Sequence, residues 1–218
     1  MSLEEKVAQV KANIAAAARE VGRDPSEITL VAATKVQTSD TIRQAIAAGV
    51  TICGENRVQE MTAHLDDDAY AGAALHFIGH LQTNKVKQVV GRVDLIESVG
   101  SEHLLDAIEA QAAKLDLVQY ILLEINIGGE ESKSGISPEE LPALAQKAAA
   151  CPHVNLRGLM AIPPVAEGPD GNRPFFAKMR QLFVDISSKM SDNGTTIDCL
   201  SMGMSGDYED AVREGATL

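Results

Sequence analysis

The feature that most constrains the fold is an alternation of short apolar runs with amphipathic segments of helical length, repeated along the whole chain. Seven runs rich in Val, Ile and Leu are each followed by a segment with helical periodicity. We expect strands at 28–35, 50–55, 75–80, 93–99, 118–126, 154–162 and 197–202. We expect helices after them at 38–48, 57–65, 83–90, 101–115, 138–150, 174–190 and 206–214. Because the apolar runs are nearly continuous, they predict a parallel α/β sheet that is covered by helices on its faces.

The number of strands limits the possible architectures. Seven strand–helix units are one short of a (β/α)8 barrel, and the chain ends at 215–218, where an eighth strand is expected to begin. We therefore predict a (β/α)8 TIM barrel with an extra N-terminal helix at 3–21 and with its last strand missing from this chain. The alternative is a doubly wound open sheet. No segment reads as a linker, so residues 1–218 are expected to form a single domain.

The charge balance limits the class of partner. The chain has 19 basic and 31 acidic side chains and a net charge of −12, which disfavours binding to nucleic acid or to anionic membranes. No apolar stretch reaches the roughly 18 residues needed to span a bilayer, and the N-terminus lacks the apolar core of a signal peptide. We therefore expect a cytoplasmic protein that binds neither nucleic acid nor membranes, and we expect a monomer.

Lys35 is the first candidate functional residue. It closes the apolar run ITLVAAT at 28–34 and is followed by a polar turn and a helical segment. In parallel α/β folds, residues at the carboxyl ends of the strands form the functional face. A partly desolvated amine at that place is a candidate nucleophile toward carbonyl groups. The alternative is a lysine that merely extends from the strand end into water.

The turn after the seventh strand is the second candidate. Gly203 and Gly206 allow a close approach of the backbone to a ligand, Ser205 supplies a hydroxyl group, and a helix is expected to begin near Asp207. Such a turn can bind phosphate, and barrels commonly hold a phosphate after strands seven and eight. The alternative is an ordinary helix start capped by Asp207, whose carboxylate would repel a phosphate dianion unless it points away.

The lysine and the turn together indicate a ligand that is both an aldehyde and a phosphate ester. Pyridoxal 5'-phosphate (PLP), held as a Schiff base on Lys35, has both groups. A Schiff-base aldolase acting on a sugar phosphate needs the same two features and an acid/base residue near the lysine. Neither Glu55 nor Glu124 can be assigned to that role from the sequence.

Six motifs follow one another along the chain: VAATK (31–35), GENRVQE (54–60), HFIGHLQTNK (76–85), SKSG (132–135), RGLM (157–160) and LSMGMSGD (200–207). In this order they resemble the pyridoxal phosphate homeostasis proteins, also called YggS-like or PROSC proteins. The resemblance implies a fold like the N-terminal barrel of alanine racemase without its second, all-β domain, with PLP on the lysine that matches Lys35. It also implies a regulator of PLP supply and amino-acid balance that has no settled catalytic activity.

The resemblance also assigns the other cofactor-binding residues. Asn56 would lie beside the cofactor ring and Met160 would pack near it, while Ser201, Ser205 and Gly206 would surround the phosphate. The family pattern continues with an Arg-x-Gly-Thr segment that forms the last strand and contributes to the ring and phosphate sites. That segment is not present in this chain.

Two functions remain open at this point. The first is a PLP-binding homeostasis protein that passes the cofactor to apo PLP-dependent enzymes without turnover of its own. The second is a PLP-dependent enzyme acting on amino acids, such as a weak racemase. Racemisation needs a second base on the opposite face, which the racemases take from the second domain. Tyr208 lies near the phosphate turn, but we expect it to pack against a helix instead.

The remaining features are expected to be structural. His76 and His80 lack a third metal ligand at suitable spacing, and the acidic run at 66–68 lacks the pattern of a calcium loop. Lys133 is either a second anion contact or a surface residue, and 165–174 is either a lid or an inert loop. Three widely spaced cysteines are expected to be reduced core residues: Cys53, Cys151 and Cys199.

Overall fold

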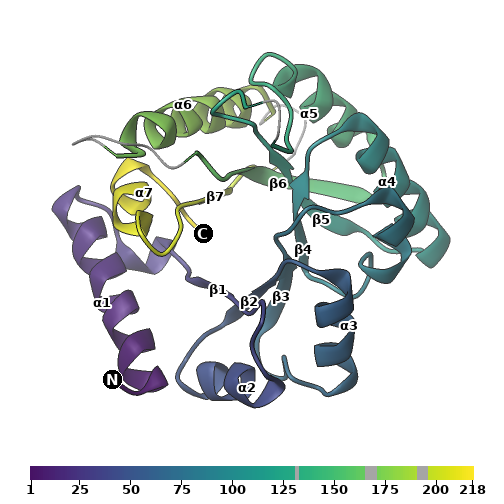
Figure 1. Ribbon diagram of the computed structural model, residues 1–218. Helices are drawn as coiled ribbons and strands as arrows, with labels where there is room; N and C mark the ends of the chain where they lie inside the picture. Colours follow the sequence, from purple (N-terminus) through teal and green to yellow (C-terminus); the bar gives the residue numbers. More distant parts are fainter. Residues whose placement is uncertain (131–132, 165–170, 191–195) are drawn as a thin grey trace.

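Seven parallel strands form one sheet that curls around a central axis, with the helices on its outer side (Figure 1). The computed structural model describes residues 1–130, 133–164, 171–190 and 196–218. The strands are β1 (Val31–Ala33), β2 (Ile52–Glu55), β3 (Ala74–Phe77), β4 (Leu95–Val99), β5 (Gln119–Glu124), β6 (Val154–Ala161) and β7 (Cys199–Met202). The α-helices are α1 (Leu3–Glu20), α2 (Ser39–Ala47), α3 (Val58–Asp66), α4 (Glu102–Leu115), α5 (Leu141–Ala150), α6 (Arg173–Met190) and α7 (Tyr208–Glu214). Two 3-10 helices complete the set, η1 (Pro25–Glu27) and η2 (Thr83–Gln88).

The strand order confirms the barrel-like architecture. All seven predicted strands are present, and neighbouring strands in the sheet follow the chain order from β1 to β7. Each of these pairs is parallel. A doubly wound sheet would reverse its strand order at a switch point, so that alternative is wrong.

The segment at 83–90 differs from the helix predicted there, because it forms the six-residue 3-10 helix η2. Val86, Val89 and Val90 are all buried. These positions are spaced i, i+3 and i+4, the apolar pattern of an α-helix. The 3-10 helix nevertheless ends at Gln88, and Val89 is its C-cap residue, so the apolar pattern does not account for the tighter winding.

The last residues of the chain lie between the two outermost strands. Thr217 and Leu218 both donate their backbone N–H groups to the carbonyl of Leu200 in β7, at 2.9 and 3.2 Å. Thr29, just before β1, donates its N–H to the carbonyl of Thr217 at 2.9 Å. The beginning of an eighth strand is thus already in place, which refines the expectation that this strand is missing.

The two faces of the sheet carry different side chains. The outer face packs under the helices and contributes Cys53, Phe77, Ile96 and Ile121 to the main core. The inner face surrounds the barrel lumen, where a smaller cluster forms from Leu95, Leu122, Met160, Cys199 and Leu218. Because strand residues alternate between faces, each functional residue can be assigned to the lumen or to the outer face by its position.

The extra N-terminal helix is confirmed as α1. Ser2 caps it through a reciprocal capping box with Glu5. Its buried residues Ile14 and Ala18 pack with Val212 of α7, so α1 lies beside α7 on the outside of the barrel (Figure 1).

Candidate functional site

The carboxyl ends of β1 and β2 bring Lys35 and Asn56 to the same level of the barrel. Ala33 pairs with Gly54 in the parallel register, so Lys35 and Asn56 each follow two residues later on the lumen side. Asn56 is partly buried, and its Oδ1 atom has no hydrogen-bond partner among the described residues. An unpaired buried acceptor is uncommon in folded proteins and marks this position as one that can receive a donor.

Lys35 lies in an exposed turn beyond the end of β1. The partial desolvation expected from the sequence is therefore not observed, because the strand ends at Ala33 and residues 35–36 form a solvent-exposed turn. The next residue, Val36, has a positive φ of 63° and 81% of its surface exposed. The amine is accessible, and the backbone that carries it has an unusual conformation.

On the other side of the barrel, residues of β5, β6 and β7 lie next to one another at a second level. Glu124 pairs with Met160, and Met160 pairs with Ser201. Met160 is 3% exposed and belongs to the lumen cluster, so it forms an apolar wall beneath the mouth. Met160 and Ser201 therefore lie on the lumen side, whereas Lys35 and Asn56 follow the paired residues Ala33 and Gly54 by two positions.

Ser201 has a partner that the sequence did not indicate. Its hydroxyl donates to Glu97 Oε2 at 2.6 Å, and Glu97 Oε1 lies 2.6 Å from His76 Nδ1. Both Glu97 and His76 are buried. A serine has one hydroxyl hydrogen, so Ser201 in this arrangement cannot also donate to a phosphate. A charged residue within the apolar run 93–99 was the only sequence signal for this buried chain of hydrogen bonds.

The turn after β7 presents free donors. The backbone N–H groups of Ser205 and Gly206 donate to no group in the described parts of the chain, and both residues are exposed. Asp207 makes no side-chain cap bond to α7. Its carboxylate instead accepts from the Met204 N–H and from Asn172 Nδ2 at 2.7 Å. The predicted alternative of an Asp207-capped helix is therefore wrong in its side-chain contact.

Gly203 allows this turn to fold back onto α7. It has a φ of +94°, and a Cβ there would lie 2.7 Å from the Ala211 Cβ and 3.0 Å from the Tyr208 Cα. No residue with a side chain fits that space without displacing the helix. The glycine thus holds the free N–H groups of the turn against the carboxyl end of β7.

A cavity of about 550 Å³ opens beside this site, at the carboxyl ends of β3, β4 and β5. Its lining includes His80, Ser98 and Glu124, and none of the predicted cofactor-binding residues. Glu124 Oε1 accepts from the Ser134 hydroxyl at 2.7 Å, whereas its Oε2 is buried without a partner among the described residues. Burial raises the pKa of Glu124 above its ordinary value, although the bond from Ser134 and the charge of His80 oppose the shift.

This raised pKa predicts a pH-dependent stability. The folded protein holds the Glu124 proton more tightly than the unfolded chain, so the free energy of unfolding should fall as pH rises from the ordinary carboxyl range through the raised pKa. Glu124→Gln removes this titration. We expect the variant to gain ~1–2 kcal/mol over the wild type at high pH and little at low pH, in urea unfolding at about pH 4 and about pH 8.

A matched control is Glu139→Gln, because Glu139 is exposed and has no hydrogen-bond or ion-pair partner among the described residues. This control should follow the wild type at both pH values. An equal gain from Glu124→Gln at both values would contradict the assignment of a buried, titrating carboxyl group.

Comparison with known proteins identifies the family. The protein-family model of the alanine racemase N-terminal domain matches residues 6–217. A pyridoxal phosphate homeostasis protein of Aquifex aeolicus is 39% identical over 214 residues, covering 98% of this chain and 92% of that protein. Another, from Pseudomonas aeruginosa, is 36% identical over 216 residues and is covered to 91%. The chain belongs to the pyridoxal phosphate homeostasis protein family.

A solved structure from the same comparisons supports this placement. PipY of Synechococcus elongatus, solved with PLP bound, superposes with a TM-score of 0.84 at 29% sequence identity. The match covers 99% of this chain and 95% of PipY. The predicted resemblance to the pyridoxal phosphate homeostasis protein family, and to the alanine racemase N-terminal barrel, is thus confirmed.

The other predicted features of this pyridoxal phosphate homeostasis family member lie mostly outside the site. Tyr208 accepts a hydrogen bond from Asn13 of α1 at 2.9 Å, which confirms its packing against a helix. Lys133 is exposed and pairs with Glu130 at 2.9 Å. Residues 165–170, which include most of the predicted loop or lid, lie outside the described residues.

The histidine and cysteine predictions can also be placed. His76 contacts Glu97, whereas His80 is exposed, and no group of three metal-ligating side chains occurs within the residues that the structure describes. All three cysteines are free, and burial raises the pKa of Cys53 to about 11, as expected for a reduced core thiol. None of the described helices is long and apolar enough to cross a membrane.

Proposed function

We propose that this chain binds PLP as a Schiff base on Lys35 and serves PLP homeostasis by passing the cofactor to apo PLP-dependent enzymes without turnover of its own. The observation that carries the proposal is the presence of an accessible amine and two free backbone N–H groups at the same end of one barrel. PipY, which has been solved with PLP, supports the choice of ligand. PLP, when bound, supplies an aldehyde that condenses with an amine and releases one water molecule.

The residues present fit such a ligand. Lys35 supplies the amine, and the unpaired Oδ1 atom of Asn56 lies at the same level of the barrel, where it can accept a donor from the ring. Met160 closes the site from below as an apolar wall. The N–H groups of Ser205 and Gly206 can bind the phosphate oxygens, since the Asp207 carboxylate is engaged by Met204 and by Asn172.

Exposure of Lys35 favours exchange over chemistry. A second amine can reach an exposed turn, add at the carbon bonded to the Lys35 nitrogen and release the lysine as a free amine, with no oxidation or reduction. The Tyr208 side chain packs against Ile14, Ala18 and Val212 between α1 and α7 and accepts from Asn13 of α1, so it faces away from the barrel mouth, where racemisation requires a second base. These two observations favour a carrier over the alternative, a weakly racemising enzyme.

Mixing the PLP-loaded protein with an apo PLP-dependent enzyme tests the hand-off. We expect the enzyme to regain activity faster than PLP leaves the loaded protein spontaneously, as measured with a chemical trap for free PLP. A loaded sample reduced with borohydride is the control, because its cofactor is fixed and should restore no activity. Recovery no faster than spontaneous release would show that direct transfer does not occur.

The alternative function has its own readout. Incubation of the loaded protein with L-amino acids in deuterated water should give no α-proton exchange at enzyme-like rates. Exchange at such rates would favour the PLP-dependent enzyme instead.

A further inference from the structure

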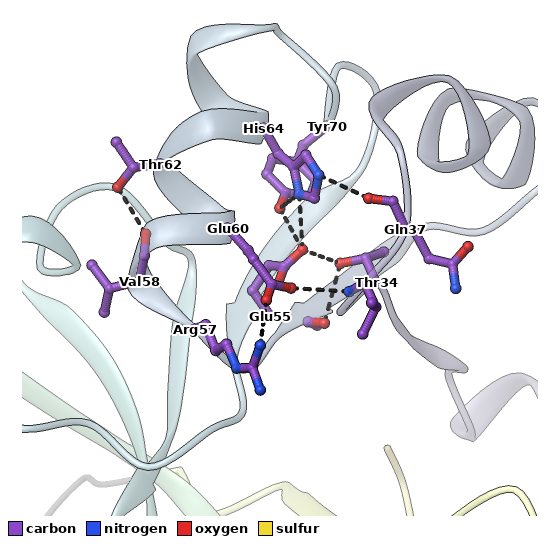
Figure 2. Close-up of polar contacts among 11 residues, drawn as sticks. Thr34, Gln37, Glu55, Arg57, Val58, Glu60, Thr62, His64 and Tyr70 are labelled. Carbon is purple, nitrogen blue, oxygen red and sulfur yellow. Dashed lines mark hydrogen bonds and ion pairs between the residues drawn. The ribbon is translucent and has the colours of Figure 1, made fainter.

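The residues on both sides of Lys35 are each held by a side chain from the segment that contains β2 and α3 (Figure 2). The Thr34 hydroxyl donates to Glu55 Oε1 at 2.6 Å. The Val36 N–H donates to Glu60 Oε2 at 2.9 Å. The third contact joins the carbonyl of Gln37 to His64 Nε2 at 3.1 Å. The backbone around the lysine is therefore fixed at three successive points by one neighbouring segment.

Val36 shows that this backbone needs support. Its φ of 63° lies in the left-handed region, which is unfavourable for a β-branched residue. Its side chain is 81% exposed, so packing does not hold it there. Two hydrogen bonds support it: the Gln37 N–H donates to the Thr34 carbonyl at 3.1 Å and closes the turn, and the Val36 N–H donates to Glu60, whose other carboxylate oxygen accepts from Arg57 Nη1 at 3.0 Å. The bond from Val36 lowers the pKa of Glu60, which keeps the carboxylate ionised and available as an acceptor.

The contacts to Glu55 and His64 form a buried cluster on the outer face of the sheet, behind Lys35. Glu55 is fully buried, and its Oε1 also lies 2.8 Å from the Tyr70 hydroxyl and 3.1 Å from His64 Nδ1. His64 therefore faces an acceptor with each ring nitrogen, the carboxylate at Nδ1 and the Gln37 carbonyl at Nε2. Nδ1 also lies 3.1 Å from the Tyr70 hydroxyl, so His64 is joined to the buried cluster through Nδ1 and to the turn through Nε2.

We infer that Glu55, Glu60 and His64 are positioning residues that hold the Thr34–Gln37 turn so that it presents the Lys35 amine to the barrel mouth. The inference rests on the proposed function, in which that amine reacts with an aldehyde. None of the three side chains lies in the lumen. Glu55 is on the outer face of β2, as Cys53 is, because strand residues two positions apart share a face. Glu60 and His64 lie on α3, outside the sheet. All three act through the backbone of the turn.

Glu60→Ala tests the inference most directly, because Glu60 is only partly buried and is not part of the hydrophobic core, so its loss should leave the core intact. We expect the fixation of PLP on the Lys35 peptide by borohydride to slow about tenfold, the usual worth of one charge-assisted hydrogen bond. Glu60→Gln retains one oxygen acceptor and should slow the reaction less. Glu139→Ala, at an exposed position without a partner among the described residues, should react as the wild type does.

Val36→Gly provides the rescue, because glycine adopts a positive φ without strain. In the Val36→Gly background, Glu60→Ala should slow the reaction by no more than about twofold. An equal slowing in both backgrounds would overturn the inference, since Glu60 would then not act through Val36. So would a Glu60→Ala variant that reacts at the wild-type rate.

A measurement without any cofactor separates the inference from the proposed function. In nuclear magnetic resonance spectra of the wild type, the Val36 amide proton should shift as Glu60 titrates, and this shift should vanish in Glu60→Gln. If the amide does not respond to Glu60, the inference fails. If the amide responds but the wild type forms no adduct with PLP, the proposed function fails, whereas the hydrogen bond by which Glu60 holds the turn is still demonstrated.

Discussion

Replacing Lys35 by alanine should lower by ~100-fold or more the PLP adduct that we expect borohydride to fix on the wild-type peptide containing Lys35. The Lys35 amine is exposed at this end of β1, so an aldehyde in solution can reach it. The measurement is mass spectrometry of the labelled peptide after reduction and digestion. Lys35→Arg should lose the label equally, because an arginine keeps the charge but remains protonated.

The turn at 203–206, which we propose binds the phosphate, offers an internal check on this result. Both variants keep the free N–H groups of Ser205 and Gly206, so weak, non-covalent binding of PLP should persist in them. A wild-type label found mainly on another lysine, such as Lys133, would contradict the assignment of Lys35. Thermal unfolding of the variants should match that of the wild type, since the lysine side chain is exposed and has no hydrogen-bond or ion-pair partner among the described residues.

Replacing Gly158 by alanine should cause the largest loss of stability. Gly158 pairs with Cys199 in the β6–β7 ladder, and a Cβ at this position would lie 1.7 Å from the Cys199 carbonyl oxygen. The backbone of β7 cannot move far enough to relieve this clash without breaking the hydrogen bonds between β6 and β7. We expect a loss of ~3–5 kcal/mol in the free energy of unfolding, measured by urea denaturation.

Gly206→Ala is the matched control for this substitution. A Cβ at Gly206 would meet no heavy atom within 4 Å, so the unfolding free energy should change by ~0.5 kcal/mol or less. Because β7 carries Ser201 and leads into the phosphate turn, Gly158→Ala should also weaken PLP binding. A Gly158→Ala variant as stable as the wild type would show that β6 and β7 can separate locally without cost.

The strands could be predicted because burial on both faces requires long apolar runs. The run at 28–34 ends at Lys35, and this ending locates both the strand and the amine. The sequence could not predict on which face of the sheet a single acidic side chain within such a run would lie. Glu55 and Glu97 occur in similar patterns, yet Glu55 lies on the outer face with Tyr70 and His64, whereas Glu97 lies in the lumen with Ser201.

Contacts between distant segments explain the other differences. The direction of the Asp207 carboxylate depends on Asn172, which is far from it in the sequence. The conformation of Val36 likewise depends on Glu60, which belongs to the next strand–helix unit. No local pattern contains such information, because register and side-chain direction are fixed only when the strands assemble.

The bonds that join Thr29 to Thr217, and Thr217 to Leu200, connect the segment before β1 to the segment after α7. A ribosome that is still making α7 therefore holds a molecule whose first strand lacks its final neighbour. Contacts of such large sequence separation form slowly, and an unpaired strand edge is open to other chains in the meantime. Pairing of the segment before β1 with the segment after α7 should consequently be a late step in folding, and partly folded chains should aggregate more readily before it than after it.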